Sequence, residues 1–162
     1  MKLCINCGFQ RPNRYKAETC PQCNSYLKYI EAPAKGTAIK LHSAGLSVSY
    51  ATAEVYSYAH GAIHCVNINI GLAHPYQSTV LCRLPNGFGY VLPHSKDYLN
   101  HTRMELLLSP VCSYGILRFE TPYFDRGEAR AMLKKKLKEL DDWVDEALED
   151  GWLAICNLAG LL

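Results

Sequence analysis

The sequence lacks long apolar runs and the common signatures of nucleotide-dependent and hydrolytic enzymes. No stretch of about 20 consecutive apolar residues occurs, so we expect neither a membrane-spanning helix nor a membrane partner. No glycine-rich phosphate-binding loop, dinucleotide fingerprint or Gly-x-Ser-x-Gly motif is present. Met1-Lys2-Leu3 leads directly into Cys4 without an apolar signal stretch, so we expect a cytoplasmic protein.

A strong charge of either sign is also missing, because the net charge of the 162 residues is only +2. The charge is nevertheless uneven. Residues 1–40 carry seven Lys or Arg against two Glu, residues 41–124 are balanced, and residues 125–162 carry six basic against nine acidic side chains. The N-terminal end is therefore the candidate surface for an anionic partner. The length of 162 residues suits one domain, or one domain plus a small module, and hydrophobic residues make up 49%, so a core can form.

Eight cysteines are present, and their spacing divides them into two groups. Cys4-x-x-Cys7 and, after twelve residues, Cys20-x-x-Cys23 form two close pairs. The others lie singly in apolar context: Cys65, Cys82, Cys112 and Cys156. In a reducing compartment, paired spacing is typical of metal ligands, and isolated cysteines are typical of buried thiols.

Each cysteine pair predicts a tight turn that directs two thiolates at one ion. Gly8 and Asn24 follow the two pairs, and both tolerate the positive φ that turns backbone N–H groups toward the sulfurs. Pro21 stiffens the second turn. Two such turns predict a tetrahedral thiolate site, which suits Zn²⁺, and a redox-active dithiol is the alternative.

In the segments Cys-Ile-Asn-Cys-Gly and Cys-Pro-Gln-Cys-Asn, residues 1–30 resemble the zinc-ribbon or rubredoxin-like knuckle class. The resemblance implies a structural Zn²⁺ with four protein ligands and no open coordination position, in a module that often contacts nucleic acid or protein. Rubredoxin-type iron is the alternative metal. Because about 30 residues bury too little surface to fold alone, we expect the metal to hold this end together. Residues 31–162 carry no such resemblance.

Cations are concentrated between and just after the cysteine pairs. Arg11, Arg14 and Lys16 lie in the intervening loop with Tyr15, and Lys28 follows the second pair. The cations can contact phosphates, and the aromatic ring can stack on a base. These five residues are therefore the candidate surface for nucleic acid or a protein partner. A solvated loop without a partner is the alternative interpretation.

The chain as a whole predicts an α+β fold, with a mostly antiparallel sheet of five to seven strands and a long C-terminal helix. Residues 31–37 contain Pro and Gly and are interpreted as a linker. This interpretation divides the chain into a zinc-ribbon-like module, residues 1–30, and an α+β domain, residues 38–162.

Between about residues 38 and 120 the pattern is that of β-strands, because apolar residues alternate with polar or small ones. Asn86-Gly87 lies between two apolar runs, Thr79–Leu84 and Phe88–Leu92, and predicts a hairpin. The segment Tyr98–Leu108 fits either a short helix or a strand.

Residues 126–150 predict one long helix. Asp125 is the expected N-cap, Glu128 stands at the capping-box spacing, and Gly151 is the expected C-cap glycine. Apolar residues recur at helical spacing between them. The tail Trp152–Leu162 is almost entirely apolar, so we expect it to pack on the sheet as a strand or short helix, or to form an oligomer contact.

Histidines and tyrosines of the β region give two further hypotheses. His60, His64 and His74 are near one another in the chain and are candidate ligands of a catalytic metal, with packed or surface histidines as the alternative. Several tyrosines would form a stacking platform if they shared an exposed sheet face, and are ordinary strand residues otherwise. They are Tyr50, Tyr56, Tyr58, Tyr76, Tyr90 and Tyr98.

We therefore expect a non-enzymatic binding or regulatory protein that holds a structural Zn²⁺ through its paired cysteines and contacts nucleic acid or another protein. A small inhibitor or adaptor of a nucleic-acid-handling enzyme fits the same features. The alternative is a metal- or histidine-dependent hydrolase, with its site in the β domain.

Overall fold

The structure is a computed structural model of the chain, and it describes residues 1–162 except residues 15, 75, 77–80, 82–83, 92–114 and 159–162. The elements follow in the order β1 (Lys2–Leu3), β2 (Gln10–Arg11), β3 (Lys28–Ile30), η1 (Ala32–Ala34), α1 (Lys35–Ser43), β4 (Val48–Tyr58), η2 (Ala59–Gly61), β5 (Ile63–Leu72), β6 (Gly89–Val91), β7 (Gly115–Tyr123), α3 (Arg126–Glu149) and α4 (Trp152–Leu158).

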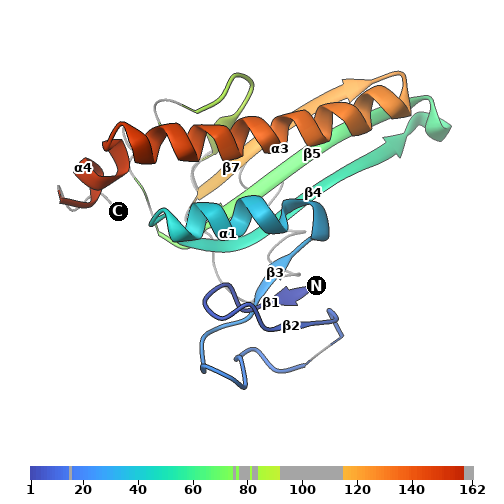
Figure 1. Ribbon diagram of the computed structural model, residues 1–162. Coiled ribbons are helices and arrows are strands. Elements are labelled where there is room, and N and C mark those ends of the chain that lie inside the picture. Colours follow the sequence, from blue (N-terminus) through green and yellow to red (C-terminus); the bar gives the residue numbers. More distant parts are fainter. Residues whose placement is uncertain (15, 75, 77–80, 82–83, 92–114, 159–162) are drawn as a thin grey trace.

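The strands form a seven-stranded sheet in the order β2-β1-β3-β4-β5-β7-β6. Every neighbouring pair is antiparallel except β3 and β4, which are parallel and are joined by η1 and α1. The predicted α+β class, with a mostly antiparallel sheet and a long C-terminal helix, is confirmed. Figure 1 shows α1 and α3 side by side across β4 and β5, with the short strands β1, β2 and β3 below them.

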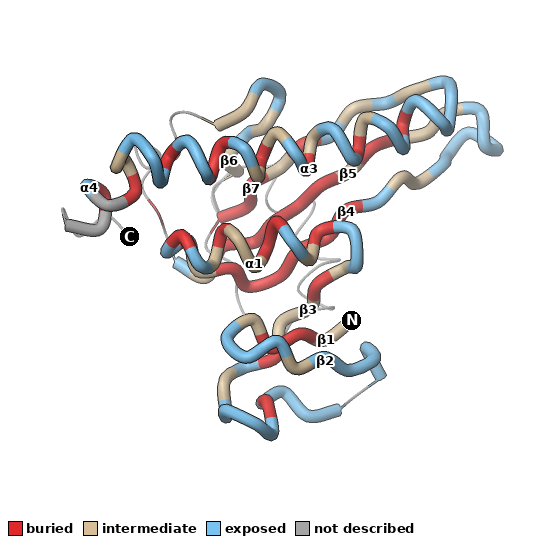
Figure 2. The backbone as a smooth tube through the Cα atoms, in the orientation of Figure 1, coloured by how far each residue is buried: buried red, intermediate tan, exposed pale blue. Residues whose placement is uncertain are grey.

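The core lies between the sheet and the two helices. Val66, Ile68 and Ile70 alternate along β5 with polar residues, so all three side chains extend from the face that α3 covers. Figure 2 shows the corresponding buried stripes along the strands and along the inner sides of the helices. Each large aliphatic side chain buried in this way contributes about 1.5 to 3 kcal/mol to the stability of the fold.

The long helix begins and ends where the sequence predicts. Asp125 has extended backbone geometry, and its carboxylate accepts a hydrogen bond from the Glu128 N–H at 2.8 Å. Gly151 ends the helix with φ of +73°. The apolar tail continues as α4, with Leu153 and Cys156 buried in the main core, whereas the predicted oligomer contact stays a prediction.

None of the helices in the described part of the chain has both the length and the apolar character needed to span a bilayer.

The interpretation of residues 31–37 as an irregular linker is wrong, because they form η1 and the first turn of α1. Pro33 lies in the first turn of η1, a position that its fixed φ suits. Ala34, Ala38 and Leu41 then recur at helical spacing and are buried in the core. The division into residues 1–30 and 38–162 stays a prediction, and the sheet includes strands from both parts.

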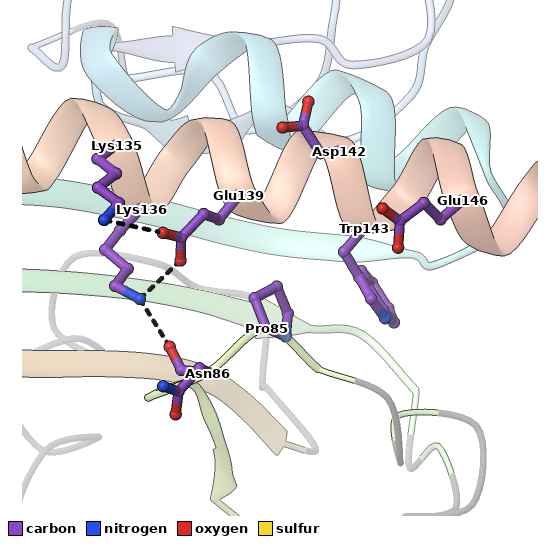
Figure 3. A pocket seen from close by; sticks show the side chains of 8 residues that line it. All are labelled: Pro85, Asn86, Lys135, Lys136, Glu139, Asp142, Trp143 and Glu146. Carbon is purple, nitrogen blue, oxygen red and sulfur yellow. Dashed lines mark hydrogen bonds and ion pairs between the residues drawn. The ribbon is translucent and has the colours of Figure 1, made fainter.

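The turn predicted at Asn86-Gly87 is present, and it contacts α3 (Figure 3). Lys136 donates to the Asn86 carbonyl at 2.7 Å and to the Glu139 carboxylate at 2.6 Å. The strand after the turn, β6, pairs with β7. Most of the predicted hairpin partner, Thr79–Leu84, lies outside the described residues, as does the segment 98–108.

Replacing the N-cap should measurably destabilise the fold. Asp125→Ala removes the acceptor of the Glu128 N–H, so we expect the free energy of unfolding to fall by about 1 kcal/mol in urea titrations. Asp125→Asn is the matched control, because its side-chain oxygen also caps the helix. Equal losses in the two variants would show that the cap is not the source of the effect.

Candidate metal centre

The two cysteine pairs form equivalent turns. In the first, the Gly8 N–H donates to the Cys4 carbonyl at 2.9 Å, and in the second, the Asn24 N–H donates to the Cys20 carbonyl at 2.9 Å. Gly8 and Asn24 have φ of +77° and +58°, which confirms the prediction that both adopt the left-handed region. Each turn thereby directs its two sulfurs to the same side.

The four sulfur atoms meet in one cluster. The sulfurs of Cys4 and Cys23 are 3.4 Å apart, those of Cys7 and Cys20 3.5 Å, and all four lie within 4.8 Å of one another. These separations exceed a disulfide bond of about 2.05 Å. They are close to the edge of a tetrahedron with metal–sulfur bonds of about 2.3 Å, which is roughly 3.8 Å. The donor set therefore fits one tetrahedral thiolate-bound metal ion.

Burial divides the four ligands into two pairs. Cys4 and Cys20 are completely buried, and Leu27 and the half-buried Phe9 pack against them. Cys7 and Cys23, the second member of each pair, are exposed. The cluster therefore lies at the surface, with only a small apolar contact beneath it.

The thiols perturb one another strongly. Hydrogen bonds from the Ser25 hydroxyl and backbone N–H, assisted by the Cys4 thiol, lower the pKa of Cys23 to about 6. A hydrogen bond from the Phe9 N–H lowers the pKa of Cys7, but partial desolvation of the sulfur and the neighbouring thiols outweigh it and raise the pKa to about 12. Without a cation, repulsion between thiolates keeps some of them protonated. A divalent metal ion replaces this repulsion by attraction.

A chain of hydrogen bonds connects the cluster to α1. The Ser25 hydroxyl, which bonds to the Cys23 sulfur, accepts from the Asn6 amide at 3.0 Å. The Asn6 carbonyl oxygen in turn lies 3.1 Å from Nε2 of His42. Such partners outside the ligand set orient the ligands of a metal. No spacing in the sequence relates Asn6 to His42, so sequence reasoning missed this contact.

The five predicted partner-binding residues do not form one surface. Arg11, Arg14 and Lys16 are exposed, and Tyr15 lies outside the described residues. Arg11 pairs with Lys2, whereas Lys28 pairs with Leu3, the next residue of the same strand. Because successive residues of a strand face opposite ways, Arg11 and Lys28 extend from opposite faces of the sheet.

The three candidate histidines are not gathered into a metal site. Among the described residues, only the four cysteines form a group of three or more close metal-ligating side chains. His64 lies near the start of β5 and accepts or donates a 2.7 Å hydrogen bond with Ser57, whereas His74 follows the far end of the same strand. His60 is exposed in η2. The hydrolase alternative stays a prediction without a described site.

The tyrosines are divided between the two faces of the sheet. Tyr50, Tyr56 and Tyr58 extend from the face opposite the helices, as their partners in β5 show. Tyr76 is buried in the core on the helix side, and Tyr90 packs against the same core. The described tyrosines therefore do not form a single platform.

No protein-family model, curated protein or solved structure matches this chain.

Metal analysis of cysteine variants should identify the ligands. We expect the protein and the Cys65→Ala variant to bind one Co²⁺ per chain, with the absorption spectrum of a tetrahedral thiolate complex. Cys20→Ala should lose that spectrum, because it removes one of the four sulfurs. Cys65 is a matched control, since both thiols are buried. An unchanged spectrum in Cys20→Ala would contradict this ligand set.

Proposed function

We propose that this chain holds one structural Zn²⁺ in its four-cysteine cluster and acts as a non-enzymatic binding protein that contacts nucleic acid beside the metal. The observation that carries the proposal is the tetrahedral spacing of four thiols, all supplied by the chain itself. Zinc favours such a ligand set, and four protein ligands leave no coordination position for a substrate. In this proposal the metal stabilises the structure, and the surface beside it binds the nucleic acid.

Charge and exposure support nucleic acid as the partner. The side chains of Arg11, Arg14 and Lys16 are exposed, and none of them takes part in an ion pair with a described residue. The Arg11 guanidinium lies over the Phe9 ring, 4.8 Å from its centre. Exposed cations, one of them an arginine whose planar guanidinium lies over a ring, provide the charge and a planar group on which a base of a single-stranded nucleic acid can stack.

The segment that carries these cations is attached to the sheet at both ends. Arg11 is the last residue of β2, and beyond Arg14 and Lys16 the Ala17 carbonyl accepts a 3.1 Å hydrogen bond from the Lys2 ammonium of β1. Anchoring reduces the entropy that the loop loses when a ligand binds.

Removing zinc should loosen the cysteine-bearing end alone. Residues around the cluster bury only a few side chains, so metal coordination is their main source of stability. With EDTA we expect fast amide hydrogen exchange between Cys4 and Ser25, while α3 and β5 stay protected. Re-addition of Zn²⁺ should restore protection. Unchanged exchange after verified metal removal would contradict a structural role for the metal.

Binding to nucleic acid should depend on salt through the exposed loop. We expect the zinc-loaded protein to bind a mixed-sequence single-stranded DNA oligonucleotide with an affinity that falls as salt rises. In a variant with Arg11, Arg14 and Lys16 replaced by Ala, the slope of log K against log salt should fall by about 2, since roughly 0.7 is lost for each phosphate contact.

The matched control replaces Arg126, Arg130 and Lys134 by Ala, which removes the same charges from the exposed side of α3. An equal loss of slope in both variants would indicate attraction to overall charge rather than a site. No binding at low salt would overturn nucleic acid as the partner. The zinc site would then stand, with a protein, such as a nucleic-acid-handling enzyme that this chain inhibits or recruits, as the partner to test.

A further inference from the structure

A polar cavity of about 280 Å³ lies between the cysteine-bearing turns and the C-terminal end of α1. The polar side chains that line it come from both cysteine turns, β3, α1 and the loop before β4. They are Asn6, Ser25, Tyr26, Lys28, His42 and Ser47. Two of these side chains are basic, four are neutral and none is a carboxylate.

Among the described residues, the lysine in this cavity has no counter-charge. Lys28 is half-buried, and no ion pair or hydrogen bond to a described residue satisfies its ammonium group. Burial lowers the pKa of Lys28, and no carboxylate in the described part of the chain acts against that effect. Burial and the charge of Lys28 together lower the pKa of His42, so the two basic groups lie in each other's field. An uncompensated, partly desolvated cation costs stability that a bound anion would recover.

The hydrogen bonds around His42 leave it one free position. The Asn6 amide donates to Ser25, so the oxygen of that amide accepts from Nε2–H of His42. Nδ1 of His42 is then a buried, unprotonated acceptor with no hydrogen-bond partner among the described residues. It donates to an anion only when the ring gains a second proton, which a nearby negative charge favours. A buried ring nitrogen without a partner is uncommon, because such groups are normally satisfied by protein or by ligand.

We propose that this cavity is an oxyanion site that takes a phosphate group, with the Lys28 ammonium as its counter-charge and His42 as its second basic neighbour. The chemistry favours phosphate over a carboxylate. A lysine acts as a point charge without the planar fork of arginine, so the charge of the anion decides, and a phosphate group carries up to two negative charges where a carboxylate carries one. A free phosphomonoester and a nucleic-acid backbone share this chemistry. The site lies on the opposite sheet face from Arg11, so it does not rest on the proposed loop contact.

Titration with inorganic phosphate tests the site in the intact, zinc-loaded protein. We expect saturable NMR shifts of the His42 ring and the Lys28 side chain. Lys28→Met keeps the aliphatic stem but removes the charge, and should weaken phosphate binding about ten- to hundredfold, as expected for a lost charged hydrogen bond. Lys35→Met is the matched control, because Lys35 is a half-buried lysine outside the cavity.

The outcomes separate the site from a general effect of salt, since phosphate stabilises many proteins by exclusion from their surfaces. Saturable shifts at His42, lost in Lys28→Met and kept in Lys35→Met, support the site. Competition by the DNA oligonucleotide would identify the backbone as the source, and its absence a free phosphomonoester. Chemical shifts of the unmodified protein that do not change, or that never saturate, would overturn the site. So would a phosphate affinity of Lys28→Met equal to that of the unmodified protein. Both results are independent of what the segment around Arg11 binds.

Discussion

The parallel pairing of β3 with β4 is the constraint on which the rest of the molecule depends. It joins β1, β2 and β3, whose connecting turns carry the cysteine pairs, to the long strands of the sheet. Glu31 reinforces the joint: its N–H donates to the Ala51 carbonyl at 2.9 Å, and its carboxylate accepts from the Ala53 N–H at 3.0 Å. Leu3 and Ile30 are buried in the same core as the helices. Strands as short as β1 and β2 are not stable on their own, so their place in the sheet depends on this joint.

Two sources of stability therefore meet at the joint. On the side of the long strands and the helices, the core contains many fully buried aliphatic side chains, each worth about 1.5 to 3 kcal/mol. On the cysteine-bearing side of the joint, the described residues form only a small buried cluster, Cys4, Cys20 and Leu27. A structural zinc ion in small domains contributes about 10 to 16 kcal/mol of apparent binding free energy, so metal binding would dominate this end of the chain. The bonds from Asn6 to Ser25 and His42 then link metal occupancy to the position of α1.

Features that depend on residues close together in the sequence are predictable. Features that depend on the connection from β3 to β4 through η1 and α1 are not. The cysteine spacing and the Asp125 cap are local patterns, and the structure contains the corresponding cluster and helix. Helix α1 is not predictable in this way because Pro33 and Gly36 are typical of linkers, although Pro33 lies in η1 and Gly36 lies in the first turn of α1. The cavity between Lys28 and His42 exists because the connection through η1 and α1 brings the end of α1 beside β3. No local sequence pattern encodes that proximity.

The separation of the cations has a consequence for how the two surfaces respond to salt. Exposed charges such as Arg11 and Arg14 act through water, where the screening length is about 10 Å at 0.1 M salt. A half-buried charge such as Lys28 is screened less, and its interaction with an anion in the cavity is stronger at the same distance. Binding that persists at high salt would therefore belong to the cavity, and binding that disappears would belong to the loop. Lys28 differs from the loop cations in its burial and in the face of the sheet from which it extends.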